Sequence, residues 1–317
     1  MPEPHVVTVA GPLPVRALGV VDGHDHLFIT SPAMRGGEIE DPVRVVQEVA
    51  DARATGVRTI VELTPIGLGR RPALMRQVAA ATGVAVIAAT GYHRDVHYPP
   101  GHWVHDATTD LLARRVVADL TAGMHPRDWE GDAEPDPARA GVIKVGASYQ
   151  RVSPGERRRL EAAAIGSVRA GAAIVVHTEI GTCGPEIVDL LEGAGAATDR
   201  ILLAHLDRNP DLELHAEIAA RGVTLLYDTI GRIKYRPESV LLDLIEAMVG
   251  AGHGDRIVLG LDLGVRDYYR SYDGGPGMRT LMTSFVPRLR RRIGEAATEA
   301  LLVANPARAF AIAEARP

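Results

Sequence analysis

The chain lacks several features that would assign it to a class of protein at once. It has one cysteine, Cys183, among 317 residues, so an internal disulfide is excluded and a reducing compartment, the cytoplasm, is expected. The net charge is -5 and no long basic run occurs, which argues against nucleic acid and anionic membranes as partners. No apolar segment approaches the roughly 20 residues that span a bilayer. The N-terminal MPEPHVVTVA also lacks the basic and then apolar order of a secretory signal.

Aromatic residues are also scarce, at 4%, so the core is expected to be aliphatic. Eight short runs are rich in β-branched residues and almost continuously apolar, as strands buried on both faces are. These runs cover residues 17–26, 57–63, 84–91, 141–147, 172–178, 200–206, 222–228 and 256–262.

Amphipathic stretches with helix-boundary signals separate the runs. Asp41 and Pro42 open one such stretch and Gly56 follows it, while Ser153 and Gly171 bracket another. Eight alternating strands and helices predict an α/β protein built as a single (β/α)8 TIM barrel over residues 1–317. An open doubly wound sheet is the alternative, but no glycine-rich nucleotide-binding fingerprint follows the first strand.

Residues 1–18 precede the barrel and are expected to form a short extension. Within it, residues 5–18 are predicted to fold as a β-hairpin lid with Gly11–Pro12 as its turn.

Polar residues stand at the ends of five of the apolar runs, where nothing local accounts for them. Taken singly, each has an ordinary role, such as a hydrogen-bonded core histidine, a solvated lysine or a capping aspartate. The carboxyl ends of barrel strands meet at one face, however, and residues i and i+2 of a strand point the same way. A shared metal centre therefore explains the set better than separate roles do: His24, His26, Lys144, His177, His205 and Asp262.

The motifs around these residues resemble the phosphotriesterase-like family of the amidohydrolase superfamily. They are HDHL at 24–27, IKVG at 143–146, HTEIG at 177–181, AHLDRN at 204–209 and GLD at 260–262. The resemblance extends from about Val6 to the C-terminal LLVANPARAF. The family more often has Glu between the first two histidines, where this chain has Asp25, a side chain expected to face away from the site.

The resemblance implies a binuclear centre, commonly of zinc, although an N/O ligand set also suits Mn or Co. His24, His26 and Asp262 would hold the more buried ion, and His177 and His205 the more exposed one. Lys144 would bridge both as a carbamate formed with CO2. Glu179 is a candidate outer partner of the metals.

Such a pair of ions would lower the pKa of a bridging water and polarise the substrate's carbonyl or phosphoryl oxygen. Attack by the resulting hydroxide would hydrolyse an ester-like bond, with Asp262 as the proton shuttle.

The loops after the seventh and eighth runs point to the substrate. Lys234, Arg266 and Tyr269 lie in these loops, where barrels often bind phosphate, although solvated loop charges are the common alternative. Arg266 and Tyr269 follow Asp262 by four and seven residues, as in a branch that resembles lactonases of phosphorylated sugar lactones. By similarity, a pentonolactone 5-phosphate is the expected substrate, and Tyr92 after the third strand is expected to reach the lactone.

Other functions stay open. Acyl-homoserine lactonases and organophosphate triesterases use the same metal chemistry, but loop 263–280 offers little apolar surface to their substrates. A Schiff-base aldolase using Lys144 and a non-catalytic metal module are further alternatives.

A homodimer is expected by family analogy. The role of the histidine-rich loop 91–110 stays undecided. The histidines expected on the surface are His5, His125, His215 and His253.

Overall fold

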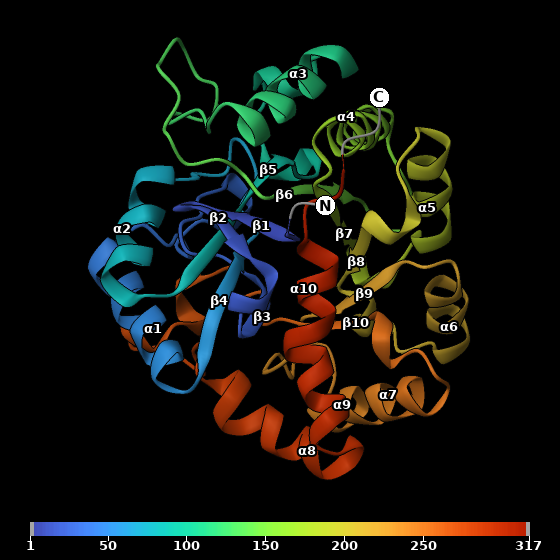
Figure 1. The fold of residues 1–317 in the computed structure, drawn as a ribbon. Helices are drawn as coiled ribbons and strands as arrows, with labels where there is room; N and C mark the ends of the chain where they lie inside the picture. Colours follow the sequence, from blue (N-terminus) through green and yellow to red (C-terminus); the bar gives the residue numbers. More distant parts are fainter. Residues whose placement is uncertain (1–2, 315–317) are drawn as a thin grey trace.

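The computed structural model describes residues 3–314 and confirms the predicted TIM barrel (Figure 1). Eight parallel strands pair in chain order, each hydrogen-bonded to the next. Their bounds are β3 Val20–Asp25, β4 Val57–Glu62, β5 Ala85–Tyr92, β6 Val142–Ala147, β7 Ala173–Thr178, β8 Ile201–Ala204, β9 Thr224–Tyr227 and β10 Ile257–Leu259. All eight lie within or one residue beyond the predicted runs.

The barrel closes between β10 and β3 at a point that matters for the site. The backbone N–H groups of Leu261 and Asp262 both donate to the carbonyl of His24, at 3.0 and 2.8 Å. A Cβ on Gly260 would lie 2.7 Å from the backbone nitrogen of His24, so only glycine allows this close approach. The closure therefore brings the first and eighth strands, and the polar residues at their ends, together.

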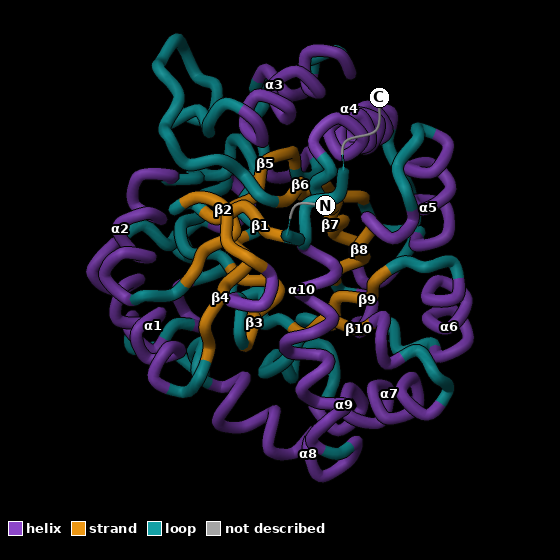
Figure 2. The backbone as a smooth tube through the Cα atoms, in the orientation of Figure 1, coloured by secondary structure: helices purple, strands orange, loops and turns teal. Residues whose placement is uncertain are grey.

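Helices surround the strands, as Figure 2 shows in purple around orange. They are α1 Pro42–Ala54, α2 Pro72–Thr82, α3 Thr109–Thr121, α4 Pro154–Ala170, α5 Gly184–Gly193, α6 Leu212–Ala220, α7 Glu238–Gly250, α8 Val286–Ile293, α9 Glu295–Glu299 and α10 Asn305–Phe310. Asp41 begins α1 and Ser153 begins α4 as their N-caps, both as predicted, and Ser153 also forms a capping box with Glu156. No helix within residues 3–314 is long and apolar enough to cross a membrane.

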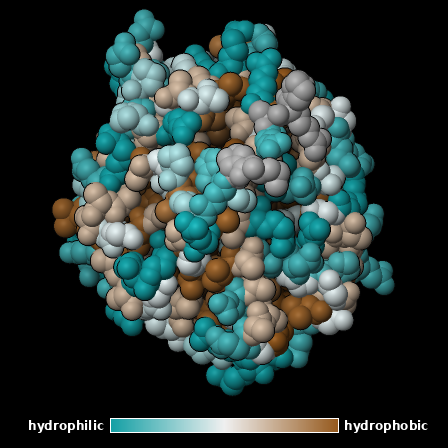
Figure 3. Space-filling view, viewed as in Figure 1, coloured by the Kyte–Doolittle hydropathy of each residue, from teal (hydrophilic) through white to brown (hydrophobic). Residues whose placement is uncertain are grey.

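A hairpin, β1 His5–Thr8 and β2 Gly11–Pro14, covers the amino end of the barrel. Val6 and Phe310 pack onto side chains inside the barrel, such as Val61 and Val142. In Figure 1 the hairpin and α10 lie across the opening, and in Figure 3 mixed hydrophilic and hydrophobic residues cover this face. The interior is thereby filled from one end, and the polar side chains gather at the other.

Two expectations from the sequence, about the hairpin turn and about exposed histidines, were wrong. Thr8 pairs with Gly11, so the turn is Val9–Ala10, and Gly11 and Pro12 already belong to the second strand. Two of the histidines expected on the surface are buried: His125 accepts backbone hydrogen bonds in the loop before β6, and His215 contacts the hydroxyl of Tyr227 at 2.7 Å.

Candidate metal centre

The six candidate ligands converge at the carboxyl end of the barrel and line one cavity of about 250 Å³. His24 Nε2 lies 3.3 Å from Lys144 Nζ and 3.4 Å from Asp262 Oδ1. His26 Nε2 lies 3.3 Å from the same Asp262 oxygen, and His205 Nε2 lies 2.9 Å from His177 Nδ1. All of these side chains are buried.

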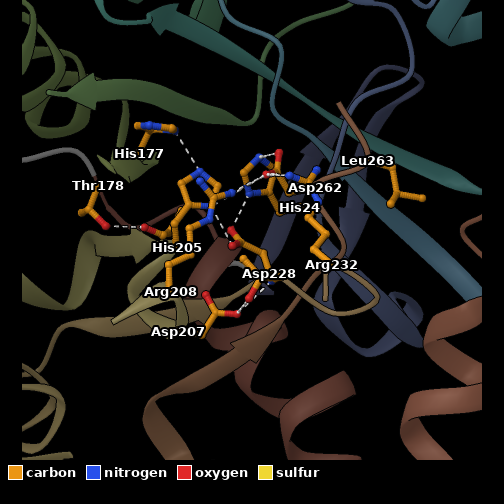
Figure 4. A network of polar contacts seen from close by, with 12 residues as sticks. His24, His177, Thr178, His205, Asp207, Arg208, Asp228, Arg232, Asp262 and Leu263 are labelled. Carbon is orange, nitrogen blue, oxygen red and sulfur yellow. Dashed lines mark hydrogen bonds and ion pairs between the residues drawn. The ribbon is translucent and has the colours of Figure 1, made fainter. Parts of the chain in front are cut away.

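One carboxylate orients two of the histidines. Asp228, which follows β9 and is fully buried, lies between His24 and His205 (Figure 4). Its two oxygens accept from the Nδ1 atoms of these two imidazoles, each at 2.7 Å. This contact places the proton of each ring on Nδ1 and leaves Nε2 with a bare lone pair.

The other two histidines are oriented in the same manner. His26 Nδ1 lies 2.9 Å from the hydroxyl of Thr64, and His177 Nε2 lies 2.7 Å from Glu179. Glu179 is held in turn by Arg94 at 2.7 Å. Each of the four imidazoles thus has one nitrogen engaged by an oxygen and the other directed at the centre, which is the arrangement that ligating histidines require.

The charges of the site also suit metal ions. Burial lowers the pKa of His24 to about 3 and lowers those of His26, His177 and His205, so all four rings are neutral at pH 7, as ligands must be. Burial likewise lowers the pKa of Lys144 to about 8, which gives this amine a neutral fraction at physiological pH.

Asp262 is kept ionised. Burial alone would raise its pKa, but the positive charge of Arg232 is the largest opposing effect, and the pKa lies well below its ordinary value. Arg208 Nη2 and Arg232 Nη1 contact Asp262 Oδ2 at 2.9 and 3.0 Å, while Oδ1 faces His24 and His26.

The residues present therefore fit a divalent metal centre. The ligand atoms of His24, His26 and Asp262 lie within 4.8 Å of one another. Those of His24, His205 and Asp228 do so as well, but there the atoms nearest Asp228 are the Nδ1 nitrogens, so Asp228 suits the role of an outer partner.

Sequence reasoning missed Asp228 and the two arginines. Asp228 ends the seventh apolar run, so the signal that selected the other strand ends applied to it too. Arg208 lies within the AHLDRN motif, whereas nothing in the sequence distinguishes Arg232 from a solvated loop arginine.

Of the predicted substrate residues, Lys234 lines the cavity, whereas Tyr92, Arg266 and Tyr269 do not. Tyr92 is buried toward the helices and donates to the carbonyl of Leu112, because it lies on the outward side of β5. Its expected contact with the lactone is therefore corrected.

Tyr269 and Arg266 are corrected as well. The hydroxyl of Tyr269 is fully buried and donates to the backbone carbonyl of His26, so it supports a ligand instead of meeting a substrate. The side chain of Arg266 is 48% exposed beside Asp267 and does not line the cavity.

Part of the histidine-rich loop reaches the cavity. His93 and His97 line it, with the ring of His93 4.7 Å from that of His177, whereas His102 and His105 do not. Asp25 also stays out of the cavity, as expected, and accepts from the backbone N–H groups of His26 and Leu263.

Known proteins match this chain along nearly its whole length. The model of the phosphotriesterase family matches residues 4–310. A phospho-furanose lactonase of Mycoplasmopsis synoviae is 33% identical over 98% of this chain and 92% of that protein.

Solved structures also match nearly the whole chain. An amidohydrolase from Mycoplasma synoviae is 31% identical, with a TM-score of 0.95 over 100% of this chain and 94% of that one. A lactonase from Listeria monocytogenes is 26% identical, with a TM-score of 0.91 over 98% of this chain and 100% of that one. The chain therefore belongs to the phosphotriesterase family and is, as the sequence predicts, a hydrolase of ester bonds.

Proposed function

We propose that the protein is a binuclear metal-dependent lactonase that opens phosphorylated sugar lactones of the pentonolactone 5-phosphate type. The relatives named phospho-furanose lactonase support the reaction class. The observation that carries the proposal is the convergence of four imidazoles, each oriented by an oxygen, with Lys144 and Asp262 in a cavity that four cationic side chains also line.

His24, His26 and Asp262 would hold one divalent ion, and His177 and His205 the other. Zinc is the first candidate, with Mn or Co also compatible with the N/O donors. When bound, such ions acidify water and polarise a carbonyl oxygen. Lys144 Nζ, a neutral amine in part at pH 7, would be carboxylated by CO2 and so present two oxygens between the two sets of ligands.

Asp262 is the proposed proton shuttle. Its carboxylate is ionised, so it can accept a proton, and it lies beside the imidazoles at the centre of the site. The two arginines on Oδ2 also weaken it as a base, so the accepted proton would pass readily to the leaving alkoxide. Asp228 and Glu179 keep three of the imidazoles in their ligating tautomers throughout, and Thr64 orients the fourth.

The cavity favours a charged substrate over an acyl chain or aryl groups. Arg94, Arg208, Arg232 and Lys234 all line it. Its aliphatic side chains are Ile29, Met34, Leu68 and Val265. A Schiff-base aldolase at Lys144 would leave the tautomer-fixed histidines around it without a role. A cytoplasmic location and a homodimer stay predictions of the sequence.

A lactone panel tests the function. Pentonolactones with and without a 5-phosphate, and acyl-homoserine lactones, would be assayed by proton release with metal-loaded enzyme. We expect the enzyme to hydrolyse the phosphorylated members faster than the others. This activity should be lost in His177→Gln but retained in the matched control His105→Gln, whose ring lies outside the cavity. Equal turnover of long-chain homoserine lactones would contradict the substrate assignment.

A further inference from the structure

A second cavity lies between α3 and the loop 122–141, which connects α3 to β6. Its volume is about 740 Å³, and none of the described residues that line it also lines the cavity of the metal centre. In Figure 1 α3 and this loop, in green, lie at the outer edge of the molecule, beyond β5 and β6. A ligand bound here would therefore leave the metal centre accessible.

A guanidinium without an acceptor lines this cavity. Arg115, on α3, is half-buried, and its side chain forms no hydrogen bond or ion pair with any described residue; its Nη1 is buried. The guanidinium packs instead on two indole rings, 3.8 Å from the ring centre of Trp103 and 5.2 Å from that of Trp129. Indole faces order a long cationic side chain but supply no acceptor oxygen to its N–H groups. Arg115 therefore presents a positive charge and free donors to the cavity.

An imidazole N–H is a second donor at the same cavity. His125 is 5% exposed, and its Nδ1 accepts the backbone N–H groups of Arg127 and Trp129, at 3.2 and 2.9 Å. Because one nitrogen of the ring accepts, the proton must lie on the other, Nε2. Nε2 has no hydrogen-bond partner within residues 3–314, and His125 lines the cavity. The nitrogen that donates is therefore available to a ligand.

The rest of the lining indicates which anion would fit. A carboxylate can accept two parallel N–H···O bonds from one guanidinium, which is a charge-assisted pairing. Leu111 and Ala118 add apolar surface, and Asp132 and Glu134, both exposed, add negative charge. These two acids repel a dianion about twice as strongly as a monoanion, because Coulomb energy is proportional to charge. A single carboxylate on an apolar body therefore fits better than a phosphate monoester.

We propose that this cavity binds a small organic monocarboxylate through the guanidinium of Arg115, with the N–H of His125 as a further donor and Leu111 and Ala118 against its apolar part. The acceptor oxygens of the ligand would satisfy donors that the chain itself leaves free. The site goes beyond the proposed function and does not depend on it, because no residue of the metal centre takes part.

The intrinsic fluorescence of the protein tests the site, because the two tryptophans of the chain, Trp103 and Trp129, both pack on Arg115. The metal-loaded enzyme would be titrated at constant ionic strength with benzoate, with benzamide as its uncharged analogue, and with phenyl phosphate as the dianion. We expect a saturable change with benzoate and a Kd at least about tenfold higher for the other two.

In Arg115→Met we expect Kd for benzoate to rise at least about tenfold, while wild-type hydrolytic activity shows that the variant folds. The matched control Arg114→Met should change Kd less than about twofold, because Arg114 is exposed and already pairs with Asp110. In His125→Asn the amide oxygen can replace Nδ1 as the acceptor while the Nε2 donor is lost, so Kd should rise about two- to tenfold.

The absence of a saturable change with benzoate would overturn the proposal, as would an unchanged Kd in Arg115→Met or an equal rise in Arg114→Met. Tighter binding of phenyl phosphate than of benzoate would overturn the monocarboxylate assignment. An unchanged Kd in His125→Asn would exclude this imidazole from the site. Loss of benzoate binding in His177→Gln but not in Arg115→Met would place the ligand at the metal centre instead.

Discussion

Replacing Asp228 by Asn tests how the ligands are oriented. The carboxylate accepts one hydrogen bond from each of His24 and His205, both at 2.7 Å. The amide of Asn has one accepting oxygen, and its NH2 group would face the second imidazole. That ring must then carry its proton on Nε2, the nitrogen directed at the metal centre, so its ligand lone pair is lost.

The expected magnitude follows from the loss of one outer partner. Mutations of such partners weaken metal binding about 10- to 100-fold, or about 1.4 to 2.7 kcal/mol. Calorimetric titration of the metal-free Asp228→Asn protein with Zn²⁺ should therefore show at least one of two binding steps weakened by that factor. The matched control is Asp207→Asn, because Asp207 is a neighbouring buried carboxylate that bonds to Thr229 and to no imidazole. Unchanged affinity at both steps in Asp228→Asn, or an equal loss in Asp207→Asn, would refute the reasoning.

Three further predictions follow from individual contacts. Because burial lowers the pKa of Lys144 to about 8 and only the neutral amine attacks CO2, metal reconstitution at a fixed concentration of dissolved CO2 should accelerate from pH 7 and level off above about pH 8, an effect absent in Lys144→Met; a flat pH profile at constant CO2 would contradict this. Tyr269→Phe should lower the free energy of unfolding by about 1–3 kcal/mol in urea titrations, since the carbonyl of His26 loses its buried donor; an unchanged free energy of unfolding would contradict this. Gly260→Ala should lower stability by about 1–3 kcal/mol and reduce metal content, because the new Cβ would press on the backbone of His24; wild-type values of both would count against the closure described here.

The fold and the candidate ligands could be predicted because both leave a local signal. Strands buried on both faces are almost purely apolar, so a histidine, lysine or aspartate at the end of one stands out. His177 and Lys144 were identifiable in this way, and the barrel topology then placed them together.

The substrate residues were harder because loop geometry decides where a side chain points. Offsets of four and seven residues after Asp262 selected Arg266 and Tyr269, but the loop turns Tyr269 inward against His26 and leaves Arg266 beside solvent. Tyr92 was misplaced because one residue along a strand reverses the face. Arg232 became visible only through its contact with Asp262, a pairing across two loops that no spacing encodes.

The metal content of active protein tests the central claim most directly. Elemental analysis of enzyme purified without chelators, alongside its hydrolytic activity, should give about two transition-metal ions per chain, the number that the two sets of ligands imply. Chelation should remove both metal and activity, and readdition should restore both. Full activity in protein that contains no stoichiometric transition metal would contradict the account.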